Sequence, residues 1–202
     1  MRADAVHFGV RLELFTVSWM LVEALVAVGA GVLARSVLLT AFGFDSVIEL
    51  LSGGVLLWRL WAEAKGGDLE RVERVEQRAI RISAFLLVLL CLYVLLTILF
   101  GLVTQLEPDQ SPLGIAVSLA AVVVMPLLAR RKHQVNERLG SAALRADIDE
   151  SITCAYMAAT VLVGLVVDAL FGLWWFEYVA AAVLLYWLAG ETREALEAAR
   201  GE

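Results

Sequence analysis

The chain has 202 residues, of which 61% are hydrophobic, and its mean hydropathy is +0.81. Soluble domains are closer to half apolar, so this composition excludes an ordinary soluble domain and indicates an integral membrane protein of one compact bundle. The net charge of -6 says little about partners, and both cysteines, Cys91 and Cys154, lie in apolar segments, so a disulfide framework is not expected.

Six segments are predicted to cross the membrane, because a spanning helix needs about 20 mostly apolar residues. They cover residues 12–34, 37–60, 80–105, 112–129, 148–168 and 170–190. We therefore expect an all-α integral membrane protein in which residues 1–202 form a single six-helix domain. A cytosolic C-terminal domain is not expected, and neither is a cleaved signal peptide.

The first predicted span carries an acid, Glu23, near its middle. Acids inside a membrane are costly and are functional hypotheses by default. Glu23 is therefore a candidate metal ligand or proton carrier, and hydrogen-bonded packing against a neighbouring helix is the alternative.

The second span contains Asp45 and Glu49, which lie one turn apart on one helix face. Counted back from Arg59 at the inner interface, Glu49 is roughly 15 Å deep, near the midplane of a core about 30 Å thick. Burying a carboxylate there costs at least roughly 2.5 kcal/mol. Two such acids would repel without a cation or proton between them, so a divalent cation is the first candidate and a protonated pair is the alternative.

The third and fourth spans carry no comparable acids. Ile82 to Leu106 is free of charge, and the fourth span ends in Arg130-Arg131-Lys132. The charged segment 66–83 is interpreted as a solvated helical lead-in to the third span, and an interfacial amphipathic stretch is the alternative.

The fifth span offers Glu150 and Cys154, again four residues apart, and Asp147 shares their face. A free cysteine is usually a small buried hydrophobe, but next to Glu150 it is a candidate thiolate ligand. Hydropathy places Glu150 near the inner start of its span, so we expect this pair to meet Glu49 before Asp45. The sixth span follows a tight hairpin over 168–172.

The distribution of basic residues predicts the orientation. With six spans, both termini share a side with the 2–3 and 4–5 connections, and that side holds 15 of the 16 Lys and Arg residues, with Arg35 as the exception. The positive-inside rule then predicts a multi-pass protein of the cell membrane with both termini in the cytosol.

Two short motifs resemble the cation diffusion facilitator family. The second helix of that family typically reads D-S-x-x-D, which resembles Asp45-Ser46-Val47-Ile48-Glu49. The fifth typically reads A-D-x-x-H-x-x-x-D, and Ala146-Asp147-Ile148-Asp149-Glu150 with Cys154 is similar to it, with Glu150 at the His position and Cys154 at the last Asp position. The likeness covers all six helices and is greatest to short, divergent bacterial members.

The resemblance implies a proton-coupled exporter that binds a divalent metal by alternating access. Its site would comprise Asp45, Glu49, Glu150 and Cys154, which could form a tetrahedral shell of three oxygens and one sulfur. Such a shell suits zinc, and cadmium, cobalt, iron(II) and manganese are the other candidates. Glu23 and Asp147 are candidate proton or metal relays. The implied partners are the lipid bilayer, the metal ion, protons and a second copy of the chain.

Two other functions fit the same residues. One is a metal-binding membrane sensor or accessory protein without transport, and the other is a proton-coupled carrier of another small cation. The sequence has no G-x-x-x-x-G-K-[ST], G-x-S-x-G or H-E-x-x-H motif, so an ATP-driven pump or hydrolase is not expected. We expect no enzyme activity, no organic cofactor and no nucleic-acid partner.

Overall fold

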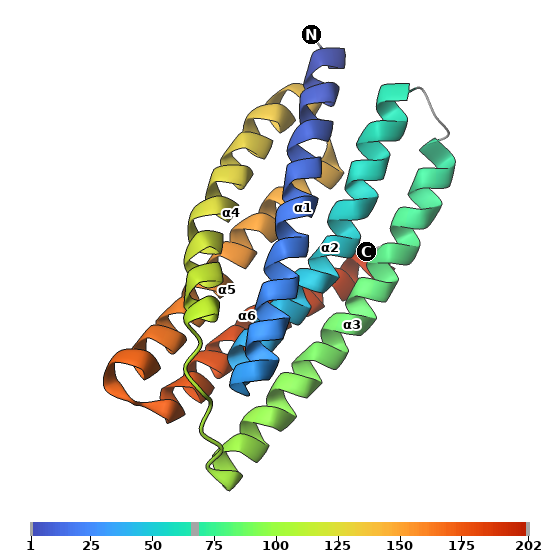
Figure 1. The fold of residues 1–202 in the computed structure, drawn as a ribbon. Helices are drawn as coiled ribbons and strands as arrows, with labels where there is room; N and C mark the ends of the chain where they lie inside the picture. The colour runs from blue at the N-terminus through green and yellow to red at the C-terminus, as the bar shows by residue number, and fades with distance from the viewer. Residues whose placement is uncertain (1, 66–68, 201–202) are drawn as a thin grey trace.

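The computed structural model describes residues 2–65 and 69–200, and within these ranges the chain folds entirely into α-helices and short connections, with no strand. The all-α prediction is confirmed for the described residues (Figure 1). The helices are α1 (Arg2–Ala34), α2 (Val37–Lys65), α3 (Leu69–Thr104), α4 (Pro112–Leu139), α5 (Ala142–Phe171) and α6 (Trp174–Arg200).

Five of these helices, α1 to α5, are long and apolar enough to cross a membrane, counted over the described residues. The sixth predicted span falls on α6, which does not reach the same hydropathy. The reason is its composition, since α6 combines four glutamates with several tryptophans and tyrosines. Glu177 is nevertheless 2% exposed, so at least one of these polar groups is directed into the bundle rather than outward.

The helices are longer than the predicted spans at the end of the bundle that carries the N-terminus. The fourth span was expected to end near residue 129, yet α4 continues to Leu139, where Gly140 adopts a left-handed conformation with φ of 64°. A second helix start follows at once, because the side chain of Ser141 caps α5 by accepting from the backbone N–H of Leu144. Charged residues end the apolar stretch of α4, but they do not end the helix. The helix ends where Gly140 adopts a left-handed conformation, and the next helix begins at the Ser141 cap.

The charged lead-in to the third span is also helical where it is described. Residues 66–68 lie outside the described ranges, and from Leu69 onward the segment forms the first turns of α3. The prediction of a continuous helical lead-in is therefore confirmed for the backbone of residues 69–83.

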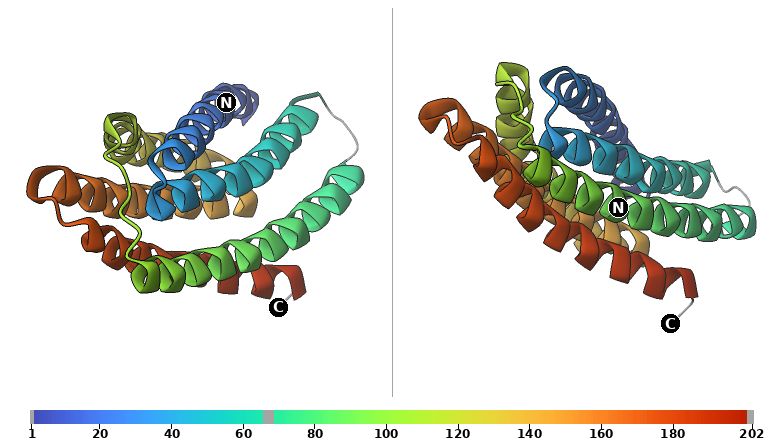
Figure 2. Two further views of the ribbon diagram at one scale, coloured as in Figure 1. Left: turned by 60° about the horizontal axis from the view of Figure 1, so that its bottom comes forward. Right: turned by 90° about the horizontal axis from the view of Figure 1, so that it is seen from below.

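The six described helices form three layers of two. Figure 2 shows α1 beside α4, α2 beside α5, and α3 beside α6, with the middle pair covered on both sides. The contacts agree with this view, since α2 touches α1, α3, α5 and α6. The acids of α2 therefore lie at the centre of the bundle, where side chains from several helices can reach them.

Close packing of α1 against α2 fixes the position of the central helix. A Cβ atom added at Gly43 would lie 2.6 Å from the backbone nitrogen of Val28, and one added at Gly31 would lie 2.6 Å from the backbone nitrogen of Thr40. Small residues at helix contacts allow such approach in membrane proteins. Two turns of α1 and α2 are thereby brought into backbone contact just beyond Asp45.

The outer surface of the bundle is apolar. Leu33, Val103 and Leu170 have exposed fractions of 80%, 84% and 72%, and many other large apolar side chains also point outward. Soluble proteins rarely expose apolar surface so continuously, whereas helices that face lipid do so by necessity. The protein is therefore a multi-pass membrane protein whose described helices contact the bilayer.

Candidate metal centre

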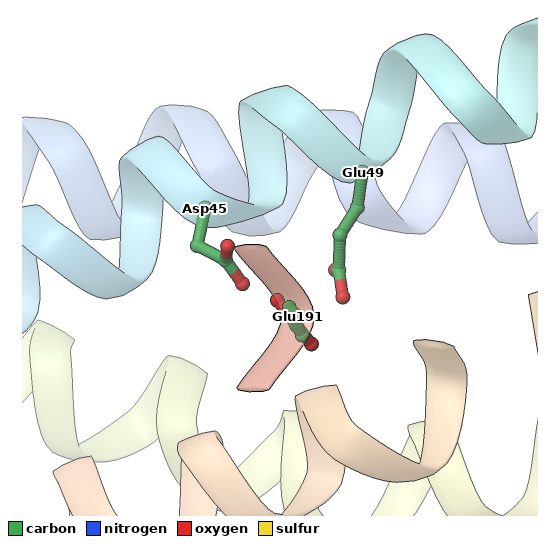
Figure 3. Close-up of side chains that lie close together, drawn as sticks. All are labelled: Asp45, Glu49 and Glu191. Atoms are coloured by element: carbon green, nitrogen blue, oxygen red, sulfur yellow. The ribbon is translucent and has the colours of Figure 1, made fainter. Parts of the chain in front are cut away.

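Asp45 and Glu49 point from one face of α2 toward α6, as their four-residue spacing predicts. Figure 3 shows both side chains directed at Glu191, which α6 presents from the opposite side. One carboxyl oxygen from each of the three residues lies within 4.8 Å of the other two. Asp45 is fully buried and Glu49 is 6% exposed, so this is a cluster of acids inside the bundle.

The cluster is short of hydrogen-bond donors. Both carboxyl oxygens of Asp45, both of Glu49 and one of Glu191 are buried and accept no hydrogen bond from the described residues. Buried polar atoms are nearly always paired, and like charges this close disfavour one another's ionisation. The arrangement therefore calls for a compensating charge, which either a cation or shared protons would supply.

A cavity of about 290 Å³ adjoins the cluster. It is lined by α2, α3, α5 and α6, and its lining runs from Asp45 and Glu49 to Ala198, close to the end of α6 at Arg200. Its polar lining includes further acids, Asp149, Glu150 and Glu194. An acidic path therefore leads from the cluster toward the end of the bundle that holds the C-terminus.

The structure places Glu150 in this cavity but outside the three-acid cluster. Its Oε2 accepts a hydrogen bond of 2.9 Å from the hydroxyl of Ser52 in α2. The carboxylate therefore lies against α2, about one turn of helix from the level of Glu49. The predicted meeting of the fifth helix with the inner part of the second helix is observed, whereas a ligand role for Glu150 stays a prediction.

Cys154 of α5 and Glu23 of α1 contact each other inside the bundle. The thiol of Cys154 donates to Oε1 of Glu23 at 3.6 Å, and the carboxylate also accepts from Ser46 at 2.9 Å and from the indole N–H of Trp19 at 2.7 Å. Glu23 and Cys154 are both fully buried. Glu23 therefore connects α1, α2 and α5 through hydrogen bonds. Cys154 also interacts with Glu49, although it is not one of the three residues whose ligand atoms converge.

Asp147 faces away from the cluster. Its Oδ2 lies 2.5 Å from Nζ of Lys132, which also lies 3.2 Å from Oε2 of Glu13. The lysine that was assigned to a basic cytosolic segment is fully buried in α4. Asp147 thus belongs to a buried ion triad (Glu13, Lys132 and Asp147), and its predicted relay role stays untested.

Sequence reasoning missed Glu191. This acid is the first residue after the predicted sixth span of 170–190, so no predicted span includes it. The signal that could have found it is helical continuity, because α6 has no break between its apolar part and Arg200. A helix that extends past its apolar stretch can still hold its next side chain inside the bundle.

Comparison with known families agrees with the motifs on α2 and α5. A family model described as the cation efflux transmembrane domain matches residues 14–200 of the 202-residue chain, a range that includes all three acids of the cluster as well as Glu23, Glu150 and Cys154. The predicted resemblance is confirmed. The chain therefore belongs to the cation efflux, or cation diffusion facilitator, family of cation transporters.

Proposed function

We propose that this protein is a proton-coupled exporter of a divalent transition metal that binds its substrate inside the membrane at Asp45 and Glu49. One observation supports this most strongly. Both acids are buried in the central helix, and their four carboxyl oxygens accept no hydrogen bond from the described part of the chain. Buried carboxylates that lack hydrogen-bond donors, at the inner end of an acidic cavity, are suited to bind a cation reversibly.

The fifth helix would complete the substrate site. Glu150 lines the approach to Glu49, and Cys154 is the candidate sulfur ligand in the frame of the family motif. A shell of carboxylate oxygens with one thiolate suits Zn²⁺, and Cd²⁺, Co²⁺, Fe²⁺ and Mn²⁺ are the other candidate substrates. Binding of sulfur requires Cys154 to exchange its hydrogen bond with Glu23 for the metal.

Proton coupling follows from the chemistry of these ligands. A carboxyl or thiol group must lose its proton before it coordinates a metal, so metal and protons compete for the same atoms. In the proposed cycle the cation loads from the cytosol through the acidic cavity, and protons that reach the site from the other side displace it.

The proposed arrangement has six spans and cytosolic termini. The α6 helix would be the sixth span, since it packs along α3 and α5 inside the bundle. The positive-inside rule then places both termini, and the mouth of the cavity near Ala198, in the cytosol. We also propose a homodimer in the cell membrane, as the family resemblance implies, with its interface on the apolar outer helix faces.

The proposal is tested by transport in proteoliposomes. Wild type, Asp45→Asn and Glu49→Gln are reconstituted, and Zn²⁺ and Mn²⁺ flux is recorded with and without a pH gradient. We expect wild-type flux that depends on the gradient, and loss of flux in both variants. Glu137→Gln is the control, because its carboxylate is 67% exposed on α4 and should leave transport unchanged.

Other outcomes would separate the alternatives. Metal binding without flux would indicate a sensor or accessory protein on the same scaffold. Flux of another small cation that is not reduced by chelators of divalent metals would indicate a proton-coupled carrier of that cation. Undiminished metal flux in both Asp45→Asn and Glu49→Gln would reject the site.

A further inference from the structure

We infer that Glu191 of α6 is a third carboxylate ligand of the transported cation. The inference rests on the proposed transport function and adds a ligand from a helix that neither sequence motif includes. An oxygen of Glu191 lies within 4.8 Å of an oxygen of Asp45 and of an oxygen of Glu49. Figure 3 shows the three side chains converging on one space from two helices.

The distances suit a cation after small side-chain rotations. Carboxylate oxygens bind Zn²⁺ at about 2.0–2.2 Å, so neighbouring oxygens in a tetrahedral shell are about 3.4 Å apart. Long side chains such as Glu49 and Glu191 can close the remaining gap without movement of the helices. Three oxygens would then leave one tetrahedral position for a sulfur or a water molecule.

The state of the acids argues for a ligand rather than for packing. Asp45 is fully buried with both carboxyl oxygens unpaired, and it faces Glu191, which has an unpaired buried oxygen of its own. A carboxyl retained only for packing would be expected to find a hydrogen-bond partner, as Glu23 does with Ser46 and Trp19. The buried ammonium group of Lys132 pairs with Glu13 and Asp147, and not with the acids of the cluster.

Glu150, the acid expected as the third oxygen donor, is held apart. Its carboxylate accepts from Ser52, and it is not one of the three residues whose oxygens converge. Since Glu150 lines the same cavity as Glu191, its position suits an earlier stage on the path of the ion. In this conformation α6 therefore supplies the third oxygen.

The test is metal binding by the purified full-length protein in detergent. Isothermal titration with Zn²⁺ and with Mn²⁺ at fixed pH compares wild type, Glu191→Gln, Glu191→Asp and Glu194→Gln. Loss of groups that only support a ligand typically weakens metal affinity about 10- to 100-fold, so loss of a ligand should cost at least about tenfold. We expect that loss in Glu191→Gln and partial retention in Glu191→Asp, which keeps a carboxylate.

Glu194→Gln is the matched comparison, because Glu194 lines the same cavity on the same helix but is not in the cluster. If Glu191→Gln weakened binding no more than Glu194→Gln, the effect would be general loss of negative charge and the inference would fail. Wild-type affinity in Glu191→Gln would also overturn it, since Gln replaces a protonated Glu without loss of shape. With Asp45→Asn still defective, that result would leave the proposed function standing.

A failure of the proposed function looks different. In that case wild type would bind neither metal, or would bind without flux, whatever the identity of residue 191. Size-exclusion profiles of every variant show whether a loss of affinity reflects misfolding, and the Asp variant supplies a folded protein that retains the charge.

Discussion

Nζ of Lys132 in α4 lies 2.5 Å from Oδ2 of Asp147 in α5. Glu13 of α1 completes the triad from the other side of the ammonium group at 3.2 Å, and Ser151 accepts a further hydrogen bond from it at 3.5 Å. Lys132 and Glu13 are essentially fully buried, and Asp147 is 8% exposed. One ammonium group thus ties together three helices at the end of the bundle that carries the N-terminus.

Removal of this lysine should destabilise the bundle strongly. In Lys132→Met the two carboxyl groups of Glu13 and Asp147 lose their counter-charge, and breaking a buried ion pair from one side costs about 3–5 kcal/mol. We expect a clear fall in the midpoint of thermal unfolding in detergent. Arg131→Met is the matched control, because Arg131 is the exposed neighbour on the same helix.

Neutralising the partners separates this effect from simple loss of packing. The triple variant Lys132→Met, Glu13→Gln, Asp147→Asn carries no stranded charge, so it should recover much of the stability lost by Lys132→Met alone. If Lys132→Met unfolded at the same temperature as Arg131→Met, the triad would have no stabilising role.

The fold was largely predictable because its signals are local. Apolar length located the helices, and the hairpin predicted over 168–172 lies where Gly172 ends α5. The inward turn of Lys132 was not predictable in this way. Its neighbours Arg130 and Arg131 are exposed, so only the packing of α1, α4 and α5 distinguishes the third basic residue from the first two.

Replacement of Cys154 tests whether sulfur joins the substrate shell. In the described conformation the thiol donates to Glu23, and serine can also donate there. Serine is a poor substitute as a soft ligand, however, so Cys154→Ser should weaken Cd²⁺ binding more than Mn²⁺ binding. Titration of both metals gives the ratio of their affinities.

Cys91 is the control for this change, since its sulfur pairs with Thr192 at 3.3 Å and it is only partly buried. Cys91→Ser should leave the Cd²⁺-to-Mn²⁺ ratio unchanged. An unchanged ratio in Cys154→Ser as well would remove the sulfur from the shell.

The candidate site was predictable on α2 and less so elsewhere. A spacing of four residues places Asp45 and Glu49 on one face whatever the rest of the fold, and the structure shows them together. Which residue faces them depends on helix offsets and on the path of α6, which the local sequence does not determine. The motifs on α2 and α5 therefore predict Glu150 and Cys154 near the pair, and the structure adds Glu191 of α6, which no motif includes.

The contact between α1 and α2 should tolerate no side chain at Gly43. A Cβ there would meet the backbone of Val28 at 2.6 Å, and a backbone cannot rotate away as a side chain can. Overpacking of this kind costs about 1–3 kcal/mol, so Gly43→Ala should lower the unfolding midpoint. Because the shift would also move α2, metal affinity at Asp45 should fall with it.

Gly54 provides the comparison on the same helix. A Cβ at Gly54 meets nothing within 4 Å, and alanine is favoured over glycine in a helix interior by about 0.8–1.0 kcal/mol. Gly54→Ala should therefore leave the unfolding midpoint unchanged or raise it. Equal behaviour of the two alanine variants would show that the close approach at Gly43 is not limiting.

Metal binding should release protons, and its affinity should therefore fall as the pH is lowered. A protonated carboxyl or thiol must lose its proton before it coordinates a metal. Below the pH range where the ligands are ionised, the apparent affinity should therefore fall about tenfold per pH unit for each proton that binding releases. Isothermal titration with Zn²⁺ in buffers of different ionisation enthalpy counts these protons directly. Glu137→Gln, an exposed change on α4, should release the same number as wild type. Binding with no proton release at any pH would mean that the acids around Asp45 are already ionised without metal, and competition between metal and protons could then not couple their transport.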